Sequence, residues 1–259
     1  MDYGIEGKVA MVAASSAGIG LATAIALARE GAHVSICGRD EARLEAAAER
    51  IPGECRSYVV DVSQAEDLEW WVEQTVEDLG QPAIVVTNTG GPPAGALPDI
   101  ADAQWQAGFD STLMNVVRLF NLTSGAMRDA QWGRFVHITS IVAKEPHDLL
   151  PISSTLRAGI QNLTRLQANS MAAHGVTVNA VLPGHTLTDR QRHLADLRAS
   201  RDGISAERAL ELQAEAVPMR RLADPDEIAA AVTFLCSHAA SYITGVNLLV
   251  DGGLTRGPG

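Results

Sequence analysis

The sequence predicts an α/β protein: a single domain built around a parallel, doubly wound sheet of about seven strands, with helices on both faces as three layers. Short, almost entirely apolar runs alternate with longer amphipathic stretches, and this alternation is typical of a parallel sheet. Strands that are apolar at nearly every position are buried on both faces, which requires helices on each side. No linker or repeat divides the 259 residues, a length that one large domain can occupy.

The expected elements follow one another along the chain. The runs expected to form strands are residues 9–14, 33–37, 57–60, 83–87, 134–139, 176–182 and 246–250. The stretches expected to form helices are residues 18–29, 41–50, 65–79, 103–130, 152–173 and 224–237. Connections between parallel strands are expected to be right-handed.

One segment breaks the alternation. Residues 186–216 are polar, have helical propensity and follow a strand end, which is where ligands bind in open α/β sheets. Within the single domain of residues 1–259 we expect this segment to form a helical lid over a substrate. A plain surface insertion is the alternative.

The composition narrows the classes of partner. The formal net charge is −11 and no stretch is rich in Lys and Arg, so we expect no nucleic-acid partner, because phosphate backbones need clustered positive charge. No run approaches the roughly 18 apolar residues that span a bilayer, and the N-terminus lacks a signal-peptide pattern. Three widely spaced cysteines, Cys37, Cys55 and Cys236, indicate buried thiols in a reducing compartment. We expect a cytoplasmic protein without a membrane or metal site.

A glycine-containing turn joins the first expected strand to the first expected helix. Gly18 and Gly20 open that helix, and glycine has no Cβ to block the close approach of a ligand. Backbone N–H groups at a helix start, together with the helix dipole, attract a diphosphate. Ser15 and Ser16 add hydroxyl donors. The turn predicts a dinucleotide site of the Rossmann kind, with an ordinary tight turn as the alternative.

The order of short motifs resembles the short-chain dehydrogenase/reductase family over nearly the whole chain, and is similar to its 3-oxoacyl-ACP reductase-like members. Ala14, Gly18 and Gly20 are spaced as in the family's T-G-x-x-x-G-x-G turn, with Ala14 at the first Gly position. Such an Ala is tolerated if its φ angle is negative. The other motifs are Asp61-Val62, Asn88-Thr89-Gly90-Gly91, Asn115, Ser140, Pro183-Gly184 with Thr188, Ser241 to Gly245, and Asp251-Gly252-Gly253.

The resemblance implies a bound nicotinamide dinucleotide. In the family, an Asp at the position of Asp61 holds the adenine edge, and the P-G-x-x-x-T motif meets the nicotinamide amide. We therefore expect cofactor contacts from Ala14, Ser15, Ser16, Gly18, Ile19, Gly20, Arg39, Asp61, Val62, Asn88, Gly90, Arg157, Pro183, Gly184 and Thr188.

The end of the second strand bears on which dinucleotide binds. Arg39 is the first charged residue after the apolar run, and a guanidinium suits a 2′-phosphate. This favours NADP(H) over NAD(H), with Ser15 or Ser16 assisting. Alternatively, Arg39 pairs with Asp40 or Glu41 at the surface, and Asp40 reaches the ribose, which would favour NAD(H).

The family's catalytic Tyr and Lys are absent. Counted from Ser140, their positions are Ser153 and Arg157, and the sequence Arg157-Ala158-Gly159 matches the family's K-A-G. A Ser hydroxyl is a far weaker acid than Tyr, whose pKa is about 10, and Arg cannot shuttle a proton. We assign Asn115, Ser140, Ser153 and Arg157 to the catalytic site; the resemblance implies that the Asn keeps a water in a proton relay.

Three functions are compatible with this site. In the first, which we favour, the protein reduces a carbonyl with another proton donor; His147, Lys144 and His185 are candidates because they follow strand ends, whereas His137 lies inside a strand. In the second, Ser140 and Ser153 stabilise the enolate formed on reduction of an enoyl or dienoyl thioester. The family's 2,4-dienoyl-CoA reductases resemble the chain in this Ser, although they keep the Lys. In the third, the chain binds NADP(H) as a sensor or inactive subunit.

The helices around Asn115 and Ser153 carry apolar residues beyond a single stripe. This breadth suggests burial against another subunit, and family members are usually tetramers or dimers. We expect a homo-oligomer, most simply a tetramer, that acts on a small-molecule substrate.

Overall fold

A computed structural model describes residues 3–257 and confirms the single parallel sheet. The strands lie in the order β3-β2-β1-β4-β5-β6-β7, with parallel pairing throughout. Their bounds are β1 Val9–Val12, β2 His33–Gly38, β3 Cys55–Val59, β4 Pro82–Thr87, β5 Gly133–Ile138, β6 Val176–Pro183 and β7 Asn247–Val250. The chain winds outward from β1 to β3, returns to β4 and winds outward again. The carboxyl ends of β1 and β4 therefore flank the point where a doubly wound sheet binds its ligand.

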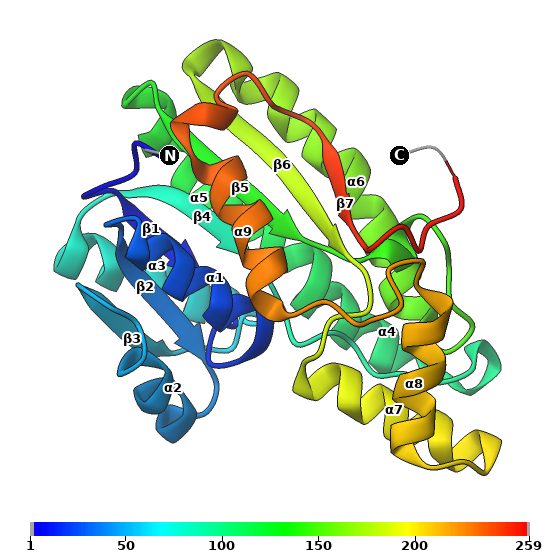
Figure 1. Cartoon of the computed structure of the whole chain (residues 1–259). Coiled ribbons are helices and arrows are strands. Elements are labelled where there is room, and N and C mark those ends of the chain that lie inside the picture. The colour runs from blue at the N-terminus through cyan, green and yellow to red at the C-terminus, as the bar shows by residue number, and fades with distance from the viewer. Residues whose placement is uncertain (1–2, 258–259) are drawn as a thin grey trace.

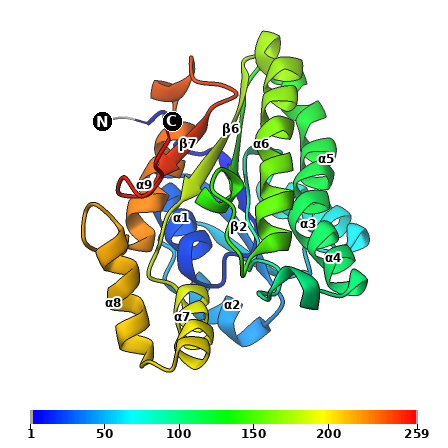
Figure 2. The same cartoon turned by 90° about the vertical axis from the view of Figure 1, so that its right-hand side faces the viewer.

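Helices cover both faces of the sheet (Figures 1 and 2). One face carries α1 (Gly18–Arg29), α2 (Glu41–Ala48) and α9 (Pro225–Cys236), whose apolar residues share a core with one side of the strands. The other face carries α3 (Ala65–Leu79), α5 (Asn115–Asp129) and α6 (Pro151–Met171), which share a second core with the opposite side. Both sides of the central strands are thereby buried, as their continuous apolar runs predict.

The segment after β6 forms a separate helical hairpin at the carboxyl ends of the strands (Figure 1, yellow to orange). It consists of α7 (Asp189–Asp202) and α8 (Ala206–Ala216). The two helices share a small core of their own, made of Ala195, Ala199 and Ala209. At the base of the hairpin, a β-bridge joins Thr186 to Ala223. The helical excursion is confirmed, and its role as a lid stays a proposal.

The expected helix over residues 103–130 is interrupted. The structure has α4 (Asp102–Gly108), then a π-helical segment from Phe109 to Met114, and only then α5. A widened turn of this kind is rare and recurs at functional sites. The apolar pattern of the sequence did not reveal this segment. Short 3₁₀ turns lie at Leu97–Asp99, Ile141–Ala143, Ala172–His174 and His238–Ala240.

One detail of burial differs from the sequence-based expectation. β3 is an edge strand whose residues are mostly exposed, so Cys55 is only half-buried, whereas Cys37 and Cys236 are buried. Burial raises the pKa of the Cys37 and Cys236 thiols to about 12. Within residues 3–257, the helices are too short or too polar to cross a membrane.

Candidate active site

A single cleft of about 1420 Å³ runs along the carboxyl ends of the strands and under α7 and α8. It is larger than a typical pocket for one small molecule, roughly 300–1,000 Å³. The predicted site residues that line it are Ala14, Ser16, Gly18, Ile19, Arg39, Asp61, Val62, Asn88, Gly90, Ser140, Ser153, Arg157, Pro183, Gly184 and Thr188. The fold thus brings most of the predicted set to one continuous surface.

The turn before α1 has the geometry that a diphosphate requires. Gly18 has a φ angle of +56°, a conformation that glycine adopts without strain. A Cβ on Gly20 would lie 2.6 Å from the carbonyl oxygen of Ala14, so only glycine fits there. Ala17 gives the helix no side-chain cap and the first turn carries no acidic residue, which leaves backbone N–H groups for an anionic ligand. These residues fit a dinucleotide.

Two expectations about this turn are corrected. Ala14 has a φ angle of +46°, not a negative one, so it occupies the left-handed region at a cost of about 1–2 kcal/mol. Ser15 is fully buried and outside the cleft: its Oγ donates to the carbonyl oxygen of Val12 at 2.6 Å, and its backbone N–H donates to that of Cys37 at 2.9 Å. Ser15 therefore braces the turn against two strands, and Ser16 is the serine that faces the cleft.

At the adenosine end of the cleft, two exposed arginines approach the end of β2. Arg39 and Arg43 both line the cleft, and Arg43 forms an ion pair of 3.3 Å with Asp189 of α7. Asp40 accepts a hydrogen bond from the backbone N–H of Arg43 at 3.0 Å and so caps α2. Asp40 caps the helix with Oδ1 and does not line the cleft, as Arg39 and Arg43 do.

A chain of amide contacts ties the middle of the cleft together. The Nδ2 of Asn88 donates to the carbonyl oxygen of Ala14 at 3.1 Å, and the Nδ2 of Asn115 donates to that of Asn88 at 3.0 Å. Asn115 directly follows the π-helical segment and is 1% exposed; its Oδ1 has no protein partner among the described residues. It lies behind the cleft lining and positions the β4 loop.

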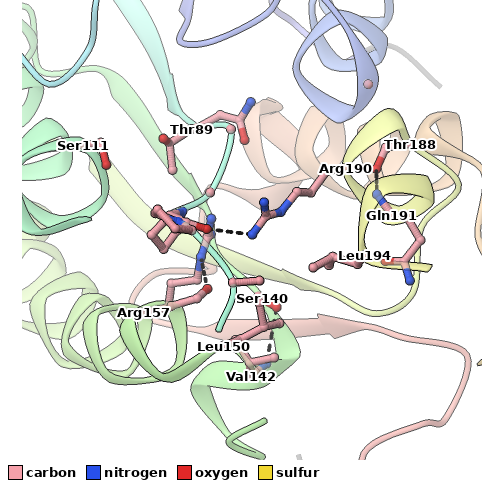
Figure 3. A pocket seen from close by; sticks show the side chains of 18 of the residues that line it. Thr89, Ser111, Ser140, Val142, Leu150, Arg157, Thr188, Arg190, Gln191 and Leu194 are labelled. Atoms are coloured by element: carbon pink, nitrogen blue, oxygen red, sulfur yellow. Dashed lines mark hydrogen bonds between the residues drawn. The ribbon is translucent and has the colours of Figure 1, made fainter. Parts of the chain in front are cut away.

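At the positions predicted to be catalytic, a guanidinium group contacts a hydroxyl group. In α6, the Nε of Arg157 donates to the Oγ of Ser153 at 3.1 Å, one helical turn earlier, and Nη1 donates to the carbonyl oxygen of Ile138 at 3.0 Å (Figure 3). Both residues are 7% exposed. Ser140 ends the loop after β5 and accepts from the backbone N–H of Val142. Burial lowers the pKa of Arg157 to about 10, with a further contribution from Arg190, so its charge persists at neutral pH.

The structure distinguishes the candidate proton donors by whether their side chains line the cleft. His147 and His185 line the cleft, whereas Lys144 does not. The Nδ1 of His147 accepts from the backbone N–H of Leu149 at 3.2 Å, so in the neutral ring the proton lies on Nε2. Partial burial lowers the pKa of both rings below the ordinary value, and His147 lowers that of His185 further. His137 is buried between Thr87 and Gln167, as expected of a core residue.

Sequence reasoning missed several charged residues that line the cleft, Arg190 among them. Arg190 lies in the first turn of α7, and its Nη2 donates to the carbonyl oxygen of Pro92 at 2.6 Å (Figure 3). The sequence did contain a signal for Arg190, because this residue comes two positions after Thr188 of the P-G-x-x-x-T motif, which is expected at the cofactor. The partner loop could not be foreseen, because Pro92 is 98 residues away.

Comparison with known proteins places the chain in a family. A family model described as enoyl-(acyl carrier protein) reductase matches residues 13–255. The 3-oxoacyl-[acyl-carrier-protein] reductase FabG of Pseudomonas aeruginosa is 33% identical over 253 residues, covering 96% of this chain and 98% of FabG. The crystal structure of L-sorbose reductase from Gluconobacter frateurii, complexed with NADPH and L-sorbose, matches with a TM-score of 0.94 at 32% identity over 100% of both chains. That of NAD⁺-bound xylitol dehydrogenase matches with a TM-score of 0.90 at 27% identity over 96% of this chain and 99% of the other. The chain therefore belongs to the short-chain dehydrogenase/reductase family of NAD(P)-dependent oxidoreductases.

Proposed function

We propose that the protein is an NADP(H)-dependent reductase that converts a ketone or aldehyde to an alcohol. The observation that carries the proposal is the contact between Arg157 and Ser153, beside Ser140 in the same cleft. NADPH, when bound, supplies the hydride. The named relatives, a 3-oxoacyl reductase and a sorbose reductase, support carbonyl reduction.

Arg157 and the two serines are proposed to stabilise negative charge on the substrate oxygen. Because the Nε of Arg157 donates to the Oγ of Ser153, the Ser153 hydroxyl is free to direct its own proton toward a substrate. A hydroxyl polarised by a buried cation is a strong hydrogen-bond donor. It is not a practical acid, so Ser153 and Ser140 hold the developing oxyanion, and the proton comes from His147 or His185.

The cofactor contacts are proposed by position. The diphosphate lies against the start of α1 at Gly18, and Asp61 and Val62 border the adenine. Pro183, Gly184 and Thr188 border the nicotinamide; a Cβ on Gly184 would lie 2.7 Å from the Cα of Asp251, so only glycine lets β6 and the C-terminal segment approach so closely.

The preference for NADP(H) is proposed from charge. Arg39, Arg43 and Ser16 line the end of the cleft where a 2′-phosphate would lie, while Asp40 is occupied as a cap. Arg39→Gln is expected to weaken NADPH binding about tenfold or more and to leave NADH binding nearly unchanged, because one charge-assisted contact is lost. Fluorescence titration of both coenzymes measures these affinities. Arg29→Gln, at the end of α1 opposite to Gly18, is the control. Equal losses for both would contradict the assignment.

Reduction of an activated C=C bond is a second candidate. The observation that favours it is that the serines offer donors to an enolate oxygen, while burial keeps the pKa values of both cleft histidines low. An enolate needs hydrogen-bond donors more than a strong acid at its oxygen.

One assay distinguishes the candidates. The purified protein is incubated with NADPH and ketones, aldehydes or enoyl thioesters, and the products are identified. Carbonyl reduction that falls in His147→Gln or His185→Gln supports the first function. Turnover of enoyl thioesters alone, lost in Ser153→Ala, supports the second. NADPH binding without any turnover would refute both and favour a sensor or inactive subunit.

We also propose a homo-oligomer, with a tetramer the expected state, in the cytoplasm. Leu122 of α5 and Leu166 of α6 are exposed on the outer side of their helices, Leu166 at 66%. Apolar side chains on adjacent helices are suited to burial against another copy. Light scattering coupled to size-exclusion chromatography gives the mass directly.

A further inference from the structure

Arg190 is held in place by the loop after β4. Its Nη2 donates to the carbonyl oxygen of Pro92, and its guanidinium lies over Gly91, where a Cβ would approach Nε to 3.5 Å. Gly91 has a φ angle of +82°, so a side chain at that position would be strained as well as close. The loop thus fixes one face of the guanidinium and leaves its other N–H donors available to a ligand.

Two arginines in the cleft near the serines, Arg157 and Arg190, have no carboxylate partner among the described residues. Arg198 and Arg201, further along α7, both pair with Asp202. Neither Arg157 nor Arg190 forms an ion pair among the described residues. Figure 3 shows Arg190 extending from α7 toward Arg157, above Ser140, with Leu194 beside it. Burial lowers the pKa of both guanidinium groups, and the positive charge of Arg190 lowers that of Arg157 further.

Two like charges that face one space destabilise each other unless an anion lies between or beside them. The diphosphate of the cofactor is expected at Gly18. Gly18 lies next to Thr188, since a Cβ on Gly18 would be 3.3 Å from the methyl group of Thr188. Arg190, in contrast, borders Pro92 and the substrate end of the cleft. A planar guanidinium with free parallel donors matches a carboxylate.

We propose that the substrate is a short oxo acid, with a carboxylate held by Arg190 while Ser140 and Ser153 bind the carbonyl oxygen. The inference rests on the proposed carbonyl reduction. In the balanced reaction, the carbonyl carbon gains a hydride from NADPH, which is oxidised to NADP⁺, its oxygen gains one proton from His147 or His185, and the product is a hydroxy acid. The carboxylate is a spectator whose charge offsets the Arg190–Arg157 repulsion.

The test compares each acid with its uncharged ester. Pyruvate and acetoacetate are assayed against their methyl esters with NADPH. The wild-type chain is expected to prefer an acid by at least about tenfold in kcat/KM. Arg190→Gln is expected to lower kcat/KM for that acid about 10- to 100-fold, mainly through KM, and to change the ester little. Arg190→Lys keeps the positive charge but loses the paired N–H donors of the guanidinium, so its kcat/KM for the acid should lie between those of the wild type and Arg190→Gln. Arg192→Gln, exposed on the same helix and outside the cleft, is the control.

A second measurement does not depend on turnover. Calorimetric titration of oxalate into the protein with NADP⁺ should show binding that weakens about 10-fold or more in Arg190→Gln and is unchanged in Arg192→Gln. Equal activity on acids and esters, or on neutral ketones alone, would overturn the oxo-acid substrate and leave carbonyl reduction standing. If Arg190→Gln instead weakened NADPH binding, Arg190 would be a cofactor ligand and the proposal would fail. If no carbonyl compound were reduced, the proposed function would fail, and the oxalate titration alone would decide whether Arg190 holds a carboxylate.

Discussion

The two ends of the cleft are built from different parts of the chain. At the proposed dinucleotide end, the features that carry the assignment are mainly backbone: the free start of α1, the close approach at Gly20 and the carbonyl of Ala14, which the Asn88 side chain holds. At the proposed substrate end, the assignment rests on the side chains of Ser153, Arg157 and Arg190. Backbone geometry survives many substitutions, whereas one substitution changes a side chain's acidity completely. The resemblance to the family at the turn rests on backbone geometry, whereas Ser153 and Arg157 stand where the sequence analysis places the family's Tyr and Lys.

The largest effect is expected from the backbone-built end. Gly20→Val places a Cβ 2.6 Å from the carbonyl oxygen of Ala14 and 2.9 Å from the Nδ2 of Asn88. The turn must shift, so coenzyme binding should be lost at every accessible concentration in a fluorescence titration. Gly125→Ala, in α5, meets nothing within 4 Å and should bind normally. Retained binding in Gly20→Val would show that the turn is not the diphosphate site.

At the side-chain end, Arg157→Gln should separate activity from stability. The expected loss in kcat is roughly 10²–10³-fold, as for removal of one oxyanion donor. The melting temperature should stay the same or rise, because a buried charge without a carboxylate partner disfavours folding. Arg165→Gln, exposed on the same helix, should change neither quantity. Calorimetry and steady-state kinetics test both, and unchanged kcat would remove Arg157 from the catalytic site.

The pH dependence sharpens the contrast further. The pKa values of His147 and His185 lie below the ordinary 6.5, so the protonated fraction grows as the pH falls from about 8 to about 6. If one ring supplies the proton, kcat for reduction should follow the protonated fraction and rise by roughly 25-fold or more over this window. The rise cannot come from Arg157, whose pKa is about 10. The pH profile of kcat should become flat when the donor histidine is replaced by Gln and should be unchanged when the other histidine is replaced. A profile unchanged in both variants would exclude His147 and His185 as proton donors.

The smallest expected effect concerns the strained turn. Ala14→Gly removes the Cβ from a residue with a φ angle of +46° and should raise the free energy of unfolding by about 1 kcal/mol. Ala13→Gly, next to it and buried, should lower that free energy instead. Urea denaturation compares the two. A loss of stability in Ala14→Gly would mean that the methyl group's packing outweighs the strain.

The sequence alone predicted the elements whose signal is local. The seven strands and the glycine turn at Gly18 appear close to where their patterns indicate, because apolar runs and helix starts have local signatures. What it could not predict depends on three-dimensional neighbours: the sign of φ at Ala14, the inward turn of Ser15 and the π-helical segment before Asn115. Arg190 belongs to the same class, since its role depends on a loop far away in the sequence.

The helical hairpin of α7 and α8 has its own small core, and Gln191 joins Gln213 across it at 2.6 Å. The bridge between Thr186 and Ala223 joins the two segments at its base, and α7 contacts the rest of the fold through the ion pair of Asp189 with Arg43 and the hydrogen bond of Arg190 to Pro92. The residues that it presents to the cleft, Leu194 and Leu197 among them, can therefore be exchanged at little expense to the main hydrophobic cores. For protein engineering, this hairpin is a replaceable module: new substrate preferences could be selected by randomising its inner face on an otherwise fixed scaffold.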